Sequence, residues 1–320
     1  MLTASWISQA VSVAAELGIA DIVNSGALTA AEIAKKVDAN PDALYRILRA
    51  LASVGVFREM EGGKFGQTPM SECLRRDVAG SMRAWARVLG AGWQWEMLGN
   101  LLTTARTGKK AWASGVFWEY FAEHKEDGQV FNQAMTSFSA SEISPVLESY
   151  DFSGIHKLMD VAGGYGSLLA AVLKAHPGMQ GILFDAPPVI EGARGEIEAA
   201  GLADRCQLAS GDFFAAVPPG SDAYMMKHII HDWDDEDALK ILKNCHAAMR
   251  PGGKLLVLES VIAPGNEPSQ GKLLDIEMLL IGGRERTEED FRKLFASAGF
   301  ELTRIVATPS PVSVVEGHKR

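Results

Sequence analysis

The second half of the chain alternates short apolar segments with amphipathic ones, and no other feature of the sequence restricts the fold as much. The apolar segments predict seven strands, at residues 157–161, 181–185, 206–210, 223–227, 254–260, 302–308 and 313–316. Helical segments separate the first five strands, which is typical of a parallel sheet with helices on both faces. A short connection from Pro309 to Pro311 joins the last two strands, so we expect them to pair antiparallel. The predicted fold class is α/β, with a mostly parallel, Rossmann-like sheet whose last strand is antiparallel.

Residues 1–80 predict a different arrangement, helices followed by a β-hairpin. Thr29 and Glu32 form a capping box that begins one helix, and Asn40-Pro41 begins the next. Gly62-Gly63 separates two short strand-like segments and predicts the hairpin turn. The first helix carries large and small apolar residues at helical spacing, namely Trp6, Ala10, Val13 and Leu17. This order of elements is the outline of a winged helix.

The segment between these regions, residues 81–150, predicts helices rich in aromatic side chains. It contains five of the seven tryptophans: Trp85, Trp93, Trp95, Trp112 and Trp118. Aromatic residues at this density can form a core, line a pocket for a flat ligand, or do both. We therefore divide the chain into three regions, at 1–80, 81–150 and 151–320.

Acidic residues outnumber basic ones, with 40 Asp and Glu against 31 Lys and Arg and a formal net charge of −9. Such a surface repels phosphate backbones and anionic lipids, so we expect neither nucleic acid nor a membrane as a partner. No apolar run reaches the roughly 18 residues that a membrane-spanning helix needs. The N-terminus also lacks the basic segment of a secretory signal. These features predict a cytoplasmic protein.

A glycine-rich segment follows the first strand of the predicted sheet. It runs from Asp160 through Ala162, Gly163 and Gly164 to Gly166, and a helix follows. Glycines let the backbone approach a ligand closely, and open parallel sheets bind ligands at the carboxyl ends of their strands. The dinucleotide pattern GxGxxG fails on spacing, and the phosphate-loop pattern is absent. The segment predicts a bound ligand of another kind, with a purely structural glycine turn as the alternative.

Polar residues also follow the second and third strands. Asp185 ends the second strand, where a carboxylate can accept hydrogen bonds from both hydroxyls of a ribose. Asp212 and Phe213 follow the third strand, where the acid can accept from an adenine amino group and the ring can pack on the base. Each acid alone could equally be a turn residue. Ligand-like features at three successive strand ends are less easily a coincidence.

The fourth strand ends in a segment that carries two histidines, His228 and His231. The ordinary pKa of histidine, about 6.5, suits a general base near neutral pH. We take His231 as that base, since it lies where the strand turns into a helix, and His228 as a structural residue. A metal site that combines a histidine with Asp232, Asp234 and Asp235 is the alternative. Acids at this point more simply form the first turn of a helix, so we expect no metal.

Two further acids lie where they could assist a histidine. Glu259 ends an otherwise apolar strand, and Glu285 lies in a loop before a helix that Thr287 caps. A carboxylate bonded to the far ring nitrogen fixes the tautomer of a histidine and stabilises its cation. The alternative is that both are surface acids.

Together these segments resemble the plant-type small-molecule O-methyltransferases, a family that includes the caffeate, isoflavone and acetylserotonin enzymes and bacterial relatives acting on polyketides and phenazines. The resemblance covers nearly the whole chain. It depends on the glycine-rich turn and on four further segments, at residues 184–187, 211–214, 227–236 and 283–287.

The resemblance implies a class I methyltransferase sheet behind an N-terminal winged-helix domain that forms a homodimer. It implies S-adenosylmethionine as the cofactor, S-adenosylhomocysteine as the product, and a small aromatic hydroxyl compound as the acceptor. His231 becomes the catalytic base, and Glu259 and Glu285 flank it. The implied cofactor-binding residues are Asp160, Ala162, Gly163, Gly164, Gly166, Asp185, Asp212, Phe213 and Lys227. The implied acceptor-binding residues are Trp95, Phe117, Phe121, Met135, Phe138, Asp232 and Met278.

The chain departs from the family pattern at two places. Ala162 replaces the first glycine of the family's turn, and the arm before Trp6 is short, which bears on the strength of the dimer.

Three other functions compete with methyl transfer. A nicotinamide-dependent oxidoreductase requires the fingerprint that fails here. A DNA-binding regulator fits the winged-helix outline, but the candidate recognition helix at 41–54 offers only Arg46 and Arg49 as cations. The third is a family member that binds the cofactor and catalyses another reaction.

Overall fold

The computed structural model describes residues 2–78, 80–112 and 114–320. Contacts divide the chain into two compact units. The first consists of the residues up to Asn100 together with Trp118–Phe138, and the second of Leu101–Phe117 together with Ser139–Arg320. The helices of residues 81–150 are thus distributed over both units.

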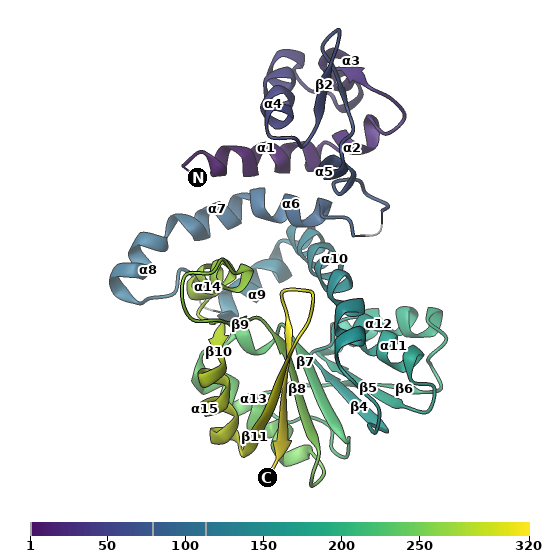
Figure 1. Ribbon diagram of the computed structural model, residues 1–320, viewed down its shortest axis with the longest axis vertical. Coiled ribbons are helices and arrows are strands. Elements are labelled where there is room, and N and C mark those ends of the chain that lie inside the picture. Colours follow the sequence, from purple (N-terminus) through teal and green to yellow (C-terminus); the bar gives the residue numbers. More distant parts are fainter. Residues whose placement is uncertain (1, 79, 113) are drawn as a thin grey trace. The chain divides into compact units, whose positions relative to one another are not determined.

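The first unit begins with four helices and a small sheet (Figure 1). Thr29 and Glu32 form the expected capping box, and Asn40 caps the next helix with Pro41 in its first turn. The helices are α1 (Ala4–Glu16), α2 (Ile19–Ile22), α3 (Ala30–Val37) and α4 (Pro41–Ser53). The strands β1 (Leu28–Thr29), β2 (Arg58–Met60) and β3 (Lys64–Gly66) pair antiparallel in the order β1-β3-β2. The predicted helices and hairpin are confirmed.

Helix α1 buries only part of the face that its apolar spacing indicates, because Ala10 and Leu17 pack against the core of the first unit but Trp6 does not. Its buried residues are Ser12, Ala14 and Ala15, whereas 72% of Trp6 is exposed. The reason is a close approach of α6 (Arg83–Gly90), where a Cβ added at Gly90 would clash with Ser12. Only small side chains fit where two helix backbones approach so closely.

Helices continue through the middle of the chain, as expected. They are α5 (Pro69–Glu72), α7 (Gly92–Gly99), α8 (Leu101–Thr107), α9 (Ser114–Glu123) and α10 (Lys125–Ser149). Aromatic rings form part of the packing in the first unit. Phe121 meets Trp93 edge to face at 5.2 Å and stacks on Phe131 at 4.6 Å. None of the helices described is long and apolar enough to cross a membrane.

The second unit contains a seven-stranded sheet in the order β11-β12-β8-β7-β4-β5-β6. The five parallel strands are β4 (Lys157–Val161), β5 (Gln180–Asp185), β6 (Cys206–Ser210), β7 (Ala223–Lys227) and β8 (Lys254–Glu259). Strand β12 (Ser313–Lys319) inserts between β8 and β11 (Phe300–Ala307) and is antiparallel to both. All seven predicted strands are confirmed, as is the antiparallel pairing of the last two.

Helices cover both faces of this sheet (Figure 1). One apolar core lies under α11 (Ser167–Ala175), α12 (Pro187–Ala199) and the end of α10, and the other under α13 (Asp235–Ala248) and α15 (Glu288–Ala298). Two short segments, β9 (Val261–Ile262) and β10 (Arg286–Thr287), pair in parallel and had no sequence signal. Helix α14 (Gln270–Ile281) lies between them in the chain. Because β4, β5, β6, β7 and β8 are parallel, their carboxyl ends share one edge of the sheet.

Candidate active site

The glycine-rich turn connects β4 to α11 and contains both packed and open backbone. A Cβ at Gly163 would lie 2.5 Å from the carboxyl carbon of Asp160 and 2.6 Å from Leu183. At Gly164, which has φ +61°, an added Cβ would meet nothing within 4 Å. The turn is therefore closed on the protein side and open at Gly164. An open glycine at the carboxyl edge of a parallel sheet is suited to close contact with a ligand.

Two carboxylates lie beside this turn. Asp185 ends β5, and its Oδ2 accepts a 2.8 Å hydrogen bond from the backbone N–H of Gly164, while Oδ1 accepts from Ala186 at 2.7 Å. Asp160 is almost fully buried, and burial raises its pKa to about 7 even though the nearby Lys227 lowers it. Burial also raises the pKa of Asp185. Acids perturbed in this way at a sheet edge are typical of functional sites.

The end of β6 carries the third ligand-like feature. Asp212 is exposed, and its Oδ1 accepts a 2.8 Å hydrogen bond from the N–H of Phe214, as a turn acid does. The ring of Phe213 meets Phe214 at 4.9 Å and Trp233 at 6.0 Å, both edge to face. The open turn, the acid of β5 and the half-buried ring of Phe213 together fit a nucleoside.

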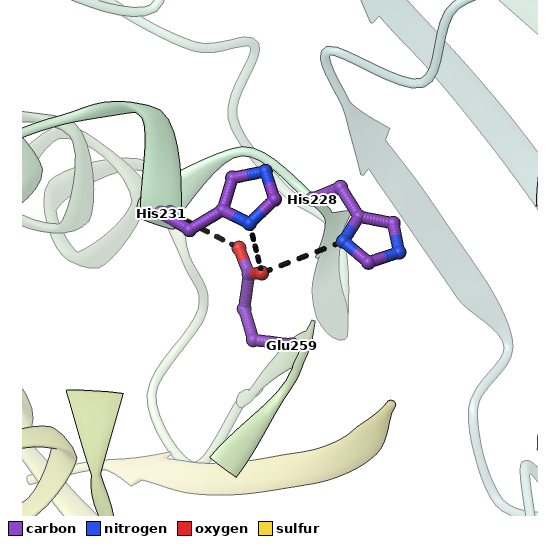
Figure 2. A group of neighbouring side chains, drawn as sticks. All are labelled: His228, His231 and Glu259. Atoms are coloured by element: carbon purple, nitrogen blue, oxygen red, sulfur yellow. Dashed lines mark hydrogen bonds and ion pairs between the residues drawn. The ribbon is translucent and has the colours of Figure 1, made fainter. Parts of the chain in front are cut away.

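His231 lies in a short 3-10 helix, η1 (Ile230–Asp232), which follows β7, and only 8% of the residue is exposed. Its Nδ1 is 2.8 Å from Oε1 of Glu285 and 3.3 Å from Oε2 of Glu259. Its Nε2 is 3.5 Å from Oδ1 of Asp232. Figure 2 shows the Glu259 carboxylate between the rings of His231 and His228. The fold thus brings the predicted base and both predicted acids together.

Both acids are buried, so the alternative that they are surface residues is wrong. Glu259 is fully buried at the end of β8, and its Oε1 accepts from the N–H groups of Ile229 at 3.0 Å and His231 at 3.2 Å. Glu285 is 5% exposed, and its own N–H donates to Asp275. It immediately precedes β10, and the pairing of β10 with β9 keeps it near the end of β8.

In this cluster, burial and the neighbouring opposite charges shift the pKa values of the side chains in opposite directions. Burial lowers the pKa of His231, but the negative charges of Glu259, Asp232 and Glu285 outweigh it and raise that pKa to about 10. Burial raises the pKa of Glu259, but His231 and His228 outweigh it and lower that pKa to about 2. The pKa of Glu285 is raised, because burial exceeds the effect of its hydrogen bond with His231. His231 and Glu259 therefore form a charged pair near neutral pH, and Glu285 shares the proton on Nδ1.

A buried arginine that the sequence reasoning missed holds the backbone around His231. Arg286 is 1% exposed, and its guanidinium donates to the carbonyl oxygens of Ile230 at 2.8 Å and Trp233 at 3.0 Å. The N–H of Arg284 donates to the carbonyl of His231 at 2.8 Å, and a Cβ at Gly283 would clash with that carbonyl. Hydrogen bonds thus hold the segment that carries Glu285 to the backbone on both sides of His231.

Lys227 and His228 share a second missed residue, Glu142 of α10. Lys227 is largely buried, and its Nζ lies 2.9 Å from Oε2 of Glu142. His228 meets the same carboxylate through Nε2. Neither Arg286 nor Glu142 has a motif of its own, although Arg286 falls inside the Glu-Arg-Thr segment on which the resemblance depends.

Two of the three acids considered for a metal site are occupied otherwise. Asp234 caps α13 by accepting from the N–H of Asp237, and Asp235 pairs with Arg284 and Arg286. Among the residues described, His228, His231 and Glu259 could offer ligand atoms within 4.8 Å of one another. Glu259 Oε1, however, already accepts two backbone hydrogen bonds, and His231 Nδ1 contacts Glu285. The expectation of a metal-free site stays a prediction.

The residues predicted to contact the acceptor fall in both units. Phe117, Asp232 and Met278 belong to the second unit, where Phe117 and Met278 are buried and Asp232 lies beside His231. The other four belong to the first unit: Trp95, Phe121, Met135 and Phe138. Within that unit Phe138 stacks on Trp85 at 5.7 Å, and 37% of Trp95 is exposed. The acceptor pocket as a whole stays a prediction.

Comparisons with known proteins identify the family. Residues 95–301 match the model of an O-methyltransferase domain, and residues 1–77 match that of an O-methyltransferase dimerisation domain. The chain is 41% identical over 320 residues to phenazine O-methyltransferase PhzM of Lysobacter antibioticus, covering 99% of this chain and 94% of that one.

Two further matches show what the family contains. The crystal structure of the O-methyltransferase NcsB1 of neocarzinostatin biosynthesis, with S-adenosylmethionine and 2-hydroxy-5-methyl naphthoic acid, matches with a TM-score of 0.84 and 32% identity, covering 98% of this chain and 96% of that one. Aclacinomycin 10-hydroxylase RdmB of Streptomyces purpurascens is 35% identical over 302 residues, covering 92% and 81% of the two chains.

These matches exclude the nicotinamide-dependent oxidoreductase alternative. The expected class I sheet, with the last strand antiparallel, is the one observed. The chain belongs to the family of S-adenosylmethionine-dependent O-methyltransferases and carries that family's dimerisation domain at its N-terminus.

Proposed function

We propose that the protein methylates a phenolic hydroxyl of a small aromatic natural product and that His231 is the general base. The observation that carries this proposal is the pair of buried carboxylates at Nδ1 of His231, 2.8 Å away in Glu285 and 3.3 Å away in Glu259. A ring whose Nδ1 is held in this way has Nε2 available to take a proton from an acceptor.

The other site residues have roles that follow from their positions. Asp185 would accept from the ribose hydroxyls, Asp212 and Phe213 would hold the adenine, and the open backbone at Gly164 would contact the cofactor. Asp160 and Lys227, also at this edge, would complete the cofactor site. Bound S-adenosylmethionine supplies a methyl group on a positively charged sulfur. Holding the acceptor oxygen in line with that group supplies much of the expected rate.

Proton transfer is the step that the chain itself controls. A phenol of pKa about 10 is a poor nucleophile until its proton is removed. Nε2 of His231 accepts that proton, and the carboxylates of Glu259 and Glu285 stabilise the imidazolium that results. Because the pKa of His231 is about 10 in the protein alone, the ring must first lose its resting proton. Activity should therefore rise with pH.

The experiment replaces His231 with alanine and measures turnover with catechols, flavonoids, hydroxycinnamates and polyketide phenols. General base catalysis contributes about 10²–10⁴-fold, so His231→Ala should lose that factor and keep its cofactor affinity. His156→Ala, which changes an exposed histidine at the far end of β4, is the matched control. Unchanged turnover in His231→Ala would refute the base. Activity lost to EDTA would indicate a metal instead.

The second candidate is a reaction other than methyl transfer. The hydroxylase name of one relative motivates it. The His231, Glu259 and Glu285 arrangement favours methyl transfer, because a base with two supporting carboxylates is what a phenol requires. Labelled methyl from the cofactor that appears in the product supports transfer, and an unlabelled, oxidised product supports the alternative.

A further inference from the structure

Glu142 is a buried carboxylate that neither the sequence motifs nor the proposed reaction uses. It lies on the part of α10 that belongs to the second unit, and its residue is 0% exposed. Its Oε2 is 2.9 Å from Lys227 Nζ, and its two oxygens are 3.0 and 3.1 Å from Nε2 of His228. A carboxylate is stable in such a place only when cationic partners replace water. One helix residue therefore holds two successive residues at the end of β7.

His228 occupies a backbone conformation that needs this support. Its φ is +55°, in the left-handed region that non-glycine residues rarely adopt. Such a conformation persists when the surroundings determine it. Its N–H donates to the carbonyl of Leu258, which holds the backbone to β8, and Glu142 holds the ring. The direction of the chain from β7 into η1, and hence to His231, depends on both contacts.

The contacts of His228 continue to His231. Nδ1 of His228 is 3.7 Å from Oε2 of Glu259, and that same oxygen is 3.3 Å from Nδ1 of His231 (Figure 2). The two rings lie 5.2 Å apart, centroid to centroid. Glu142, His228, Glu259 and His231 thus form a series in which acids and bases alternate, and all but the partly exposed His228 are buried.

We propose that Glu142 is a positioning residue for His231: it holds His228 as a cation beside Glu259, and this cation fixes the Glu259 carboxylate between the two rings. The inference rests on the proposed role of His231. An imidazole that is hydrogen-bonded to one carboxylate through Nε2 and faces a second carboxylate 3.7 Å from Nδ1 is stabilised in its protonated form. Burial lowers the pKa of His228, but Glu142 and Glu259 raise it above its ordinary value, against the opposing charge of Lys227.

Removal of the Glu142 charge has a definite consequence for His231. Without that charge the pKa of His228 falls, because its Nε2 loses the carboxylate that it is hydrogen-bonded to while the charge of Lys227 still opposes protonation. The groups that face His231 would then be Glu259, Glu285 and Asp232, with no cation 5.2 Å away to oppose them. The variant loses two charges near His231, the cation of His228 and the more distant anion of Glu142. Because the interaction between charges weakens with distance, the loss of the His228 cation has the larger effect on His231. His231 therefore holds its own proton more tightly, and its basic form requires a higher pH.

The experiment compares Glu142→Gln with Glu148→Gln, the same change at an exposed position of the same helix. Side-chain nitrogen NMR of the histidines in the free protein reads the protonation of His228 without turnover. Near neutral pH we expect His228 doubly protonated in the wild type and in Glu148→Gln, and neutral in Glu142→Gln.

Kinetics of the same variants supply the second readout. Hydrogen-bond partners of metal-binding histidines typically contribute about 10–100-fold to activity, and we expect a factor of the same order from a residue that positions a catalytic histidine. Glu142→Gln should lose that factor in kcat with little change in the KM of the acceptor, and the rise of activity with pH should move to higher pH. Glu142→Asp, which keeps the charge on a shorter side chain, should recover part of the protonation of His228.

Three outcomes would overturn the inference. The first is a neutral His228 in the wild type near neutral pH, which needs no variant to fold. The second is Glu142→Gln with a doubly protonated His228. The third is Glu142→Gln with lowered thermal stability but an unmoved pH profile, which would make Glu142 a packing residue only. Unchanged turnover in His231→Ala would instead refute the proposed function and leave the NMR result for His228 to stand by itself.

Discussion

Ala162 shows how one methyl group bears on the cofactor turn. The resemblance places a glycine of the family pattern at this position, and in this chain Ala162 adopts φ +55° while its N–H donates to the carbonyl of Phe184. A left-handed conformation costs an alanine about 1–2 kcal/mol. Glycine removes this cost but adds about 0.4–1 kcal/mol of entropy to the unfolded chain.

We predict that Ala162→Gly leaves stability unchanged or raises it by up to about 1.6 kcal/mol, the range of the difference between those two terms. Urea unfolding measures it, and calorimetry should show cofactor affinity equal to the wild type or tighter. Ala170→Gly, inside α11, is the control, because glycine there should cost about 0.5–1 kcal/mol. Equal destabilisation by both changes would contradict the strain at position 162.

At the residue scale, the charge of Glu285 influences the pH at which activity rises. Its negative charge is one of three that raise the pKa of His231 to about 10, against the opposing effect of burial. Glutamine keeps the shape and an acceptor for Nδ1 but removes the charge. The pKa of His231 should therefore fall, and its basic form should be available at lower pH.

We predict that Glu285→Gln moves the rise of activity with pH to lower pH and lowers the maximal rate, because the imidazolium loses a counter-charge. A pH series of kcat for this variant, the wild type and Glu288→Gln measures both effects. Glu288 is exposed on α15 and pairs with Arg292, so Glu288→Gln should change neither the pH of the rise nor the maximal rate. If kcat rises at the same pH in Glu285→Gln as in the wild type, Glu285 does not act on His231 through its charge.

At the scale of elements, the β9–β10 pair and the Arg286 side chain hold η1 in place. Arg286 donates to the carbonyl oxygens of Ile230 and Trp233, on either side of His231. Arg284, two residues earlier, makes an exposed pair with Asp235. The two arginines thus offer the same substitution in a buried and an exposed setting.

We predict that Arg286→Gln destabilises the protein by about 1–3 kcal/mol, since buried carbonyl groups lose their donor. It should also lower kcat, because η1 carries the base. Arg284→Gln should change stability by less than about 0.5 kcal/mol, as exposed positions do. Chemical unfolding and initial rates on the two variants test this. Equal effects would mean that Arg286 does not hold η1.

These elements also show which parts of the structure the sequence could predict. Buried parallel strands are continuous apolar runs, and capping residues such as Thr29 and Thr287 mark helix starts, so both were visible. Strands of two residues, such as β9 and β10, are too short to carry a pattern. The face of α1 was misjudged at Trp6, because close helix packing selects small residues rather than large ones.

The site was less predictable than the fold. Glu285 lies 54 positions from His231 in the chain, and Glu142 lies 86 from His228. Contacts over such separations are fixed by tertiary packing, which periodicity does not encode. Their places at strand ends and before a helix pointed to His231, Glu259 and Glu285, and the resemblance to a family then gave these residues their roles. Nothing supplied Glu142, because a single glutamate in a mixed helix has no pattern.

At the scale of the whole molecule, the dimerisation domain at residues 1–77 suggests that the enzyme acts as a homodimer. We propose this assembly for the chain, together with a contribution from Trp6. That side chain is 72% exposed on α1, while the opposite side of the helix packs on α6. Large exposed aromatics are the residues that interfaces most often use as anchors.

We predict that Trp6→Asp raises the dissociation constant of the dimer at least about thirty-fold, the effect of losing an anchor worth about 2 kcal/mol. Sedimentation velocity over a range of concentrations measures it. Val54→Asp changes another exposed apolar residue of the same domain, at the end of α4, and should leave the constant unchanged.

The two variants separate a specific anchor from general solubility. An added charge anywhere lowers nonspecific association, so equal weakening by Trp6→Asp and Val54→Asp would leave no special role for Trp6. A wild type that sediments as a monomer at every concentration would refute the dimer itself. Loss of the Trp6 ring alone should therefore move the equilibrium toward monomers at a concentration where Val54→Asp is still dimeric.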